Sequence, residues 1–375
     1  MINPAIVVIA YNRDKSLERL LGSLLKASYD SEDVTLVISI DKSDNEKVAS
    51  VADAFEWKHG EKKIILRETN LGLKKHVLEC GKLVYDYEKI IVLEDDLYVS
   101  ESFYSYARQA LDFSENCHRI AGVSLYNHCM NVHVREPFEA IDDGYDNYYM
   151  QFAQSWGQAY TRKQWQEFEE WLEENDDKSV AADNVPVNVS SWSDKSWLKY
   201  FIKYVIDTDK LFIYPRVSFT TNFGDEGTHA EGSVTDLQVP LAGKNKKAFT
   251  FSMPDESDSI YDAYFENMKL ADQIEETAAK DELSVDLYGY GKAKKKYILS
   301  SKPLPYKVIK SYGRKLRPVD ANIYMGIDGT DFFLYNTEIS DKAPDVNVPL
   351  RILYNYKALN VKKILKVLKY RLLKK

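Results

Sequence analysis

Cysteine is scarce in this chain of 375 residues, and long apolar runs are absent. The three cysteines, Cys80, Cys117 and Cys129, lie far apart and lack the spacing of a metal site. They indicate a reducing compartment with buried or inert thiols. No run approaches the roughly 18 apolar residues of a membrane-spanning helix, and the first residues lack the pattern of a signal peptide, so we expect none. We therefore expect a cytoplasmic protein.

Acidic residues are absent after Asp345, so the end of the chain differs from the rest. Seven lysines and two arginines follow, which gives residues 346–375 a charge of +9. The whole chain carries −8, and subtracting this tail leaves −17 on residues 1–345. A body this acidic argues against nucleic acid as a partner.

The basic tail at residues 351–375 has the pattern of an amphipathic helix. One apolar stripe runs along it at positions i, i+3, i+4, i+7 and i+11, which are Val361, Ile364, Leu365, Leu368 and Leu372. Lysines and an arginine occupy the other faces. Two interpretations are open. The helix docks on the acidic body, or it lies on an anionic membrane, at the inner face of the plasma membrane.

Glycine-rich phosphate-binding loops are also absent, since neither G-x-G-x-x-G nor G-x-x-x-x-G-K follows the first apolar segment. A nucleotide bound here would need a cation and side chains to neutralise its phosphates. Short apolar segments alternate with helical patterns through the first 125 residues. The strands are expected at residues 5–10, 35–40, 63–66 and 90–93. This alternation predicts an α/β fold with a mostly parallel sheet flanked by helices.

Three carboxylates, Glu94, Asp95 and Asp96, follow directly after the fourth expected strand; we call them the acid box. Ligands of such a sheet bind at the carboxyl ends of its strands. Arg13 follows the first strand and Asp41 the second, so both reach the same edge. Adjacent carboxylates repel one another, and a divalent cation is the usual means of neutralising them. A solvated acidic turn is the simpler alternative.

The alternation of strands and helices continues to about residue 240, where it ends. A helix is expected to open at Trp192–Trp197, with Asp194 in or near its first turn, where the helix dipole keeps a carboxylate ionised. A glycine-rich loop contains Glu226 and His229. For residues 241–350 we expect a smaller, peripheral C-terminal region. Further strands are expected at residues 120–125, 152–160 and 211–215.

Several blocks, in this order, resemble the GT-A fold glycosyltransferases, in particular N-acetylglucosaminyltransferase I and the transferases of bacterial polysaccharide synthesis. The blocks are Val8–Arg13, Ile40–Asp41, Val92–Leu97, Ser155–Gly157, Trp192–Asp194 and Tyr214 through His229. The resemblance implies a Rossmann-like catalytic domain at residues 1–240. Its nucleotide-sugar half would be residues 1–125 and its acceptor half residues 126–240.

The resemblance also implies roles for the acid box. Asp96 matches the residue that binds Mn²⁺ or Mg²⁺ in the family, while Glu94 and Asp95 would face the sugar and the ribose of the donor. Arg13 would meet a donor phosphate. The alternative for Arg13 is a surface residue that pairs with Glu18.

Other donor contacts are implied outside the acid box. Asp41 would accept a hydrogen bond from uracil N3, with His76 beside the same base. The alternatives are that Asp41 only caps the turn before Asp44 and that His76 is a satisfied core histidine. Glu226 and His229 are candidates for a loop that closes over the donor phosphates.

On the acceptor side, Asp194 falls on the catalytic base of the family. The family has two adjacent acids after the tryptophan, whereas this chain has Ser193 at the first position, so only Asp194 remains for that role. Trp156 and Trp192 are candidates for stacking on a sugar face, and their simpler role is apolar packing.

These features together predict an inverting, metal-dependent transferase that moves a hexosyl or N-acetylhexosaminyl group from a nucleotide-sugar, UDP-linked by resemblance. Its acceptor would be a hydroxyl of a glycan or lipid-linked glycan. Two alternatives are a non-catalytic module of the same fold that binds nucleotide-sugars or glycans, and a sugar nucleotidyltransferase. The last usually needs a glycine-rich basic loop after the first strand, and Tyr11–Ser16 contains no glycine.

Overall fold

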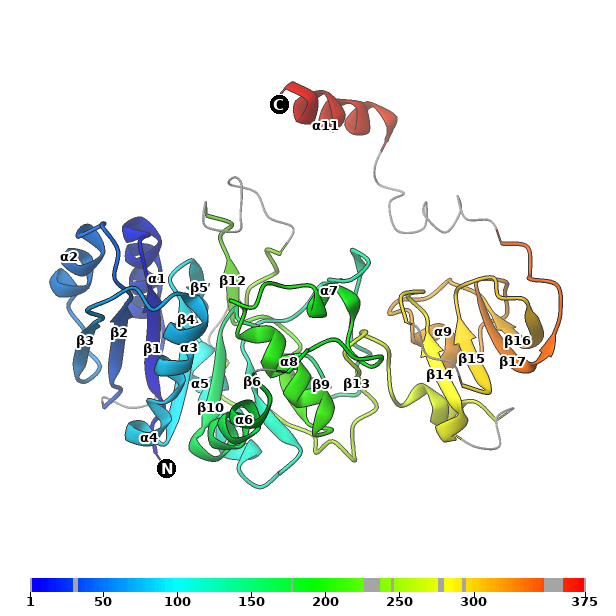
Figure 1. Ribbon diagram of the computed structural model, residues 1–375, viewed down its shortest axis with the longest axis horizontal. Coiled ribbons are helices and arrows are strands. Elements are labelled where there is room, and N and C mark those ends of the chain that lie inside the picture. The colour runs from blue at the N-terminus through cyan, green and yellow to red at the C-terminus, as the bar shows by residue number, and fades with distance from the viewer. Residues whose placement is uncertain are drawn as a thin grey trace. The chain divides into compact units, whose positions relative to one another are not determined.

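Two units make up the computed structural model shown in Figure 1. The first contains Met1–Cys129 and Ala140–Lys269, so it extends past residue 240, and the second contains Met130–Glu139 and Leu270–Lys375. The structure describes residues 2–29, 33–176, 178–225, 237–243, 246–275, 280–291, 295–346 and 360–373.

A nine-stranded sheet forms the centre of the first unit, in the order β13-β9-β11-β6-β10-β4-β1-β2-β3. Its strands are β1 (Ala5–Ala10), β2 (Leu36–Ile40), β3 (Lys62–Leu66), β4 (Lys89–Glu94), β6 (Ile120–Ser124), β9 (Asn147–Met150), β10 (Gln158–Thr161), β11 (Leu211–Pro215) and β13 (Ile260–Tyr261).

Four consecutive strands of this sheet, β3, β2, β1 and β4, are parallel. Val7 of β1 lies between Val37 of β2 and Val92 of β4, and all three side chains are buried. β10 runs antiparallel to β4 and to β6, while β6 and β11 are parallel to each other. The predicted mostly parallel α/β sheet is therefore confirmed, and its first four strands lie where the apolar segments predict them.

Helices cover both faces of the sheet. On one face, α1, α2 and α5 pack on a core that includes Leu17, Leu20 and Leu21 of α1. Each of these fully buried leucines contributes about 2 kcal/mol of transfer free energy. On the other face, aromatic rings of α6 and α8 contact β10 and β11. The helices are α1 (Asp14–Lys26), α2 (Lys47–Ala54), α3 (Leu73–Gly81), α4 (Val84–Tyr87), α5 (Phe103–Ser114), α6 (Arg162–Asn175), α7 (Val187–Ser190) and α8 (Leu198–Asp207).

A two-stranded ribbon extends from the carboxyl edge of the sheet. β5 (Leu97–Val99) follows the acid box and pairs antiparallel with β12 (Thr220–Asn222). The Phe223 N–H donates to the Asp96 carbonyl at 3.2 Å. The ribbon therefore brings a segment from more than 120 residues later in the chain beside the acid box.

The second unit has its own four-stranded sheet, in the order β14-β15-β17-β16, and its own apolar core. The hairpin of β7 (Met130–Asn131) and β8 (Glu136–Pro137) belongs to it, held in part by an ion pair between Glu136 and Arg314. Its other elements are η1 (Leu270–Gln273), η2 (Lys280–Glu282), β14 (Leu283–Asp286), β15 (Tyr297–Ser300), β16 (Tyr306–Tyr312), α9 (Ala321–Tyr324) and β17 (Phe332–Ser340).

Within the basic tail, Val361–Leu373 form the helix α11. All five residues of its predicted apolar stripe are exposed, from 43% at Ile364 to 74% at Leu372. Among the described residues, no helix is both long enough and apolar enough to cross a membrane.

Candidate active site

The acid box lies in the crevice between β1 and β4. Glu94 ends β4 and is in register with Ile9 of β1. The Asp95 N–H donates to the Ile9 carbonyl at 3.1 Å, which fixes the turn against β1. The chain leaves β1 for β2 on one side, while β4 lies on the other side, so this crevice is the switch point at which such sheets bind ligands.

Arg13 lies across two carboxylates of the acid box. Its Nη1 donates to Asp96 Oδ2 at 2.9 Å, and its Nη2 donates to Asp95 Oδ1. The Arg13 side chain is 24% exposed, whereas those of Asp95 and Asp96 are 3% and 13% exposed. Arg13 therefore pairs with these acids and not with Glu18, the surface partner considered above.

Burial raises the pKa of two members of the acid box, Glu94 and Asp95. Burial, with the charge of Asp96 as a further cause, raises the pKa of Glu94 to about 8. Burial also raises the pKa of Asp95 to about 6, against the opposing effect of Arg13. At neutral pH a large fraction of Glu94 is therefore protonated, and its carboxyl group can donate a hydrogen bond.

Asp96 is the member of the acid box that fits a metal ion. Its Oδ2 accepts from Arg13 and from Asn222 Nδ2, the latter at 3.3 Å. Its Oδ1 is buried and has no hydrogen-bond partner among the described residues. Mg²⁺ and similar cations often take one or two carboxylates and complete their shell with substrate phosphates and water. In the described part of the chain, no three His, Cys, Asp or Glu side chains are grouped to hold a metal by themselves.

Asp41 and His76 lie one strand further along the same edge. Asp41 is buried and accepts from the backbone N–H groups of Lys42, Leu71 and Gly72 at 2.9, 2.8 and 3.0 Å. These bonds fix the loop before α3, where Gly72 has a φ of 74° that favours glycine. The contact with a uracil base stays a prediction for Asp41.

His76 is buried on α3, and its Nε2 lies 2.8 Å from Ser39 Oγ. Burial lowers the pKa of His76 to about 4, although Asp41 acts in the opposite direction. The ring is therefore neutral at physiological pH. This environment matches the core-histidine alternative, and the contact with the donor base stays a prediction.

Asp194 is exposed and stands before α8, not within it. The Ser196 N–H donates to the Ser193 carbonyl at 2.9 Å, and the Lys195 N–H donates to Ser193 Oγ at 3.2 Å, so residues 193–196 form a turn. The expected helix start at Trp192–Trp197 is thus wrong, because this turn delays α8 until Leu198.

An ion pair with the buried Lys199, rather than a helix dipole, acts on Asp194. The hydrogen bond from Lys199, and more weakly the charge of Lys74, lowers the pKa of Asp194. Lys74 lies in the first turn of α3, and its Nζ is 3.9 Å from the ring centroid of Tyr200 in α8. Asp194 therefore lies near the start of α3, on the edge that also holds Asp41.

Of the four remaining candidate residues, the structure describes the two tryptophans. Trp156 is half-buried, and its ring packs 4.8 Å from that of Tyr126. Trp192 is half-buried, and its carbonyl accepts from Lys199 Nζ at 3.1 Å. Their contacts with an acceptor stay predictions. Glu226 and His229 lie outside the described residues.

The structure adds a cluster that no sequence pattern indicated. Asp225 accepts a hydrogen bond from Ser16 Oγ at 2.7 Å and forms an ion pair with Arg19. The Arg19 guanidinium also lies 4.0 Å from the ring centroid of Phe223. This cluster, which we call the α1 latch, ties the segment after β12 to α1. Its partners are about 200 residues apart, which is why a local pattern could not reveal them.

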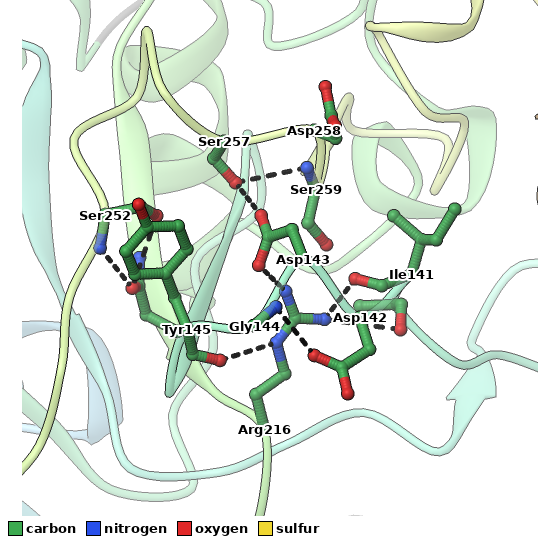
Figure 2. A network of polar contacts seen from close by, with 12 residues as sticks. Ile141, Asp142, Asp143, Gly144, Tyr145, Arg216, Ser252, Ser257, Asp258 and Ser259 are labelled. Carbon is green, nitrogen blue, oxygen red and sulfur yellow. Dashed lines mark hydrogen bonds and ion pairs between the residues drawn. The ribbon is translucent and has the colours of Figure 1, made fainter.

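Arg216, the residue after β11, anchors the segment that leads into β9, as Figure 2 shows. It donates to Asp143 Oδ1 at 2.6 Å, to the Tyr145 carbonyl at 3.2 Å and to the Ile141 carbonyl. Asp143 Oδ2 in turn accepts from Ser257 Oγ at 2.6 Å. Arg216 thus has its donors engaged in holding the edge of the sheet.

Comparisons with known proteins find one matching family and several similar solved structures. Residues 5–183 match the family described as Glycosyl transferase family 2. No curated protein sequence matches the chain. Two similar solved structures are TarS 1-349 from S. aureus (16% identity, 58% of this chain and 59% of that chain, TM-score 0.38) and the mannosyltransferase PcManGT from Pyrobaculum calidifontis in complex with GDP-Man and Mn²⁺ (12% identity, 46% of each chain, TM-score 0.33). TarS 1-349 has also been solved with UDP-GlcNAc (15% identity, 60% of each chain, TM-score 0.37).

The chain thus spans about three-fifths of the TarS 1-349 chain that it matches. The family match covers β1 through α6 and includes the acid box and Arg13. Residues 5–183 of this chain form a Glycosyl transferase family 2 domain of the GT-A type, a class of enzyme that transfers a sugar from a nucleotide-sugar.

Proposed function

We propose that this protein is an inverting, metal-dependent glycosyltransferase of bacterial surface polysaccharide synthesis. It takes a hexosyl or N-acetylhexosaminyl group from a UDP-linked donor and transfers it to a hydroxyl of a glycan acceptor. The observation that carries the proposal is the acid box in the β1–β4 crevice, with Arg13 bonded across Asp95 and Asp96 and with Asp96 Oδ1 unbonded.

The donor is held by residues at the ends of β1, β2 and β4. Asp96 would hold Mn²⁺ or Mg²⁺, which when bound stabilises the negative charge of the departing diphosphate. Arg13 binds a donor phosphate through its guanidinium, a group well suited to phosphate geometry. Glu94 and Asp95 face the sugar and the ribose, and a protonated Glu94 donates to a sugar hydroxyl. Asp41, with His76 behind it, faces the base.

Asp194 is the general base. An acceptor hydroxyl becomes an effective nucleophile when a carboxylate removes its proton, and Asp194 is exposed and ionised. Its ion pair with Lys199 must loosen as the proton is taken, because the pair lowers the basicity of the carboxylate. A single base behind the anomeric carbon gives direct displacement, so the product has the opposite anomeric configuration to the donor.

Four further side chains have roles in this proposal. Trp156 and Trp192 line the acceptor path, since an aromatic ring can stack on the apolar face of a sugar. Glu226 and His229 follow Asp225 in the sequence and would act on the donor phosphates.

The acceptor is a lipid-linked glycan at the inner face of the plasma membrane, which α11 contacts. Its apolar stripe is exposed, and its lysines would meet anionic headgroups at a gain of about 1 kcal/mol per basic residue. The helix would bring the transferase to acceptors that stay in the bilayer.

A thermal-shift screen of nucleotide-sugars, with and without Mn²⁺, tests the donor part of the proposal. UDP-sugars should raise the melting temperature only with Mn²⁺, and GDP- and CMP-sugars should raise it less. Equal shifts with every nucleotide, or shifts that EDTA does not change, would contradict it.

A further inference from the structure

We propose that Arg13 couples the binding of the divalent cation to the binding of the nucleotide diphosphate. In the free protein Arg13 is the counter-ion of the acid box, and on donor binding its guanidinium moves from Asp95 and Asp96 to the diphosphate. This inference rests on the proposed function, and it makes the two ligands of the site depend on each other.

The geometry of Arg13 is that of a shared counter-ion. One guanidinium nitrogen bonds Asp96 and the other bonds Asp95, so the charge is divided between two largely buried acids. Among the described residues, no other cation forms an ion pair with either acid. The acid box therefore depends on Arg13 for its neutralisation when no cation is bound.

Arg13 and a cation would use opposite oxygens of one carboxylate. Arg13 occupies Asp96 Oδ2, while Oδ1 is buried and unbonded. A cation at Oδ1 therefore does not displace Arg13 sterically, but its charge is repelled by the guanidinium across the carboxylate. That repulsion is strong in a site screened little by water, and it weakens the binding of a cation alone.

A diphosphate removes this repulsion. Its negative charge attracts both the divalent cation and the Arg13 guanidinium. The Arg13 side chain is 24% exposed at the β1–α1 junction, so it has room to turn away from the two acids. Asp95 and Asp96 are then released to the cation and the donor. By thermodynamic linkage, each ligand strengthens the other by the same factor, which for coupled sites is typically about 5- to 150-fold.

The test measures Mn²⁺ binding by the electron paramagnetic resonance signal of free Mn²⁺, with and without UDP. Four full-length proteins are compared: wild type, Arg13→Gln, Arg13→Lys and Lys15→Gln. Lys15 is an exposed neighbour on α1, so its variant controls for the loss of one positive charge near the site. Arg13→Lys keeps the charge but cannot bond both acids with a planar fork.

The wild type should bind Mn²⁺ weakly alone and at least about 10-fold more tightly with UDP. Arg13→Gln should bind Mn²⁺ alone at least about 5-fold more tightly than wild type and lose most of the enhancement by UDP. Arg13→Lys should be intermediate, and Lys15→Gln should match wild type.

Unchanged coupling in both Arg13 variants would overturn this inference alone. No binding of UDP to the wild type, with or without Mn²⁺, would overturn the proposed function and this inference together. If Arg13→Gln unfolds without Mn²⁺ because its acids repel, recovery of its melting temperature by Mn²⁺ would support the inference, and no recovery would oppose it.

Discussion

Each carboxylate at the site has a different environment, and its chemistry follows from that difference. Glu94 is half-buried and has a raised pKa, Asp95 shares the charge of Arg13, and Asp96 alone keeps an unbonded oxygen. Asp194 is exposed and ionised by its lysine partner. In the proposed mechanism these carboxyl groups would serve as a hydrogen-bond donor, a paired acid, a metal ligand and a base.

The base assignment predicts a separation of binding from turnover. Asp194→Asn should leave the affinity for the UDP-sugar nearly unchanged and reduce kcat of transfer by at least about 100-fold, since proton removal by a positioned base is worth about 10²–10⁴-fold. Steady-state kinetics and donor titration measure the two effects. Asp207→Asn, another acid paired with a lysine at α8, serves as the control. Near-normal turnover would move the base elsewhere, with Glu226 the next candidate.

The buried His76 predicts a loss of stability in acid. Its pKa is about 4 in the folded protein and 6.5 as a reference value, so the unfolded chain binds more protons between these pH values. The free energy of unfolding should therefore fall as pH falls from 6.5 to 4, by at most about 3 kcal/mol from this residue.

Denaturant unfolding of wild type and His76→Gln at pH 7 and pH 4.5 measures this effect. The variant should lose less stability on acidification than the wild type. Glu94 and Asp95 titrate in both proteins, so their contribution cancels in the difference. An identical pH dependence would show that His76 is not a buried neutral histidine.

Among the elements, the α1 latch is expected to hold the end of the β5–β12 ribbon in place. Asp225 holds the segment after β12 to α1, and the neighbouring Phe223 N–H bonds the Asp96 carbonyl. Asp225→Asn should lower stability by less than about 1 kcal/mol, because the pair with Arg19 is partly exposed. Hydrogen exchange followed by mass spectrometry should be faster at the amide of Phe223 in this variant than in the wild type. Asp209→Asn, at another exposed pair, is the control. Unchanged exchange would mean that the latch does not hold the ribbon.

Elements with a clear period could be predicted, and elements interrupted by turns could not. The strands at β1 to β4 coincide with β-branched apolar segments within one residue at each end. The segment at residues 152–160 predicts one strand, but β10 begins only at Gln158, because Gly157 has a φ of 95° and Gln154 bonds the backbone of Trp156. Side-chain bonds of this kind compete with strand pairing and leave no periodic signal.

The same distinction holds for the candidate site, where some contacts could be predicted from the sequence and others could not. Strand ends in a parallel sheet lie at one edge, so the order of strands alone brings Arg13 to the acid box. Asp41 bonds the loop before α3, His76 bonds Ser39 of β2, and Asp225 bonds residues far away in the sequence. Such contacts follow from tertiary packing and could not be read from local patterns.

In the molecule as a whole, the tail and the body carry net charges of opposite sign. The +9 of the tail against the −17 of residues 1–345 allows α11 to bind either the body or an anionic surface. Cosedimentation with anionic and neutral liposomes at low salt decides between them. We expect the full chain to pellet with anionic lipid and a chain ending at residue 359 to stay in the supernatant.

The double variant Ile364→Ser and Leu368→Ser keeps every charge of α11 and removes part of the apolar stripe. It should bind anionic liposomes more weakly than wild type, because an interfacial helix needs its apolar face as well as its lysines. If the full chain stays in the supernatant with anionic lipid, the tail does not bind membranes.

The products released from UDP-sugars show whether the acid box supports metal-dependent sugar transfer. With Mn²⁺, the protein should release UDP by hydrolysis or transfer, and neither EDTA-treated wild type nor Asp96→Asn should do so, while Asp86→Asn, an exposed acid before β4, should behave as wild type. Release of pyrophosphate from a sugar phosphate and a nucleoside triphosphate would identify a nucleotidyltransferase instead. Binding of UDP-sugars without any release would identify a binding module, and release by Asp96→Asn at the wild-type rate would contradict the role of the acid box.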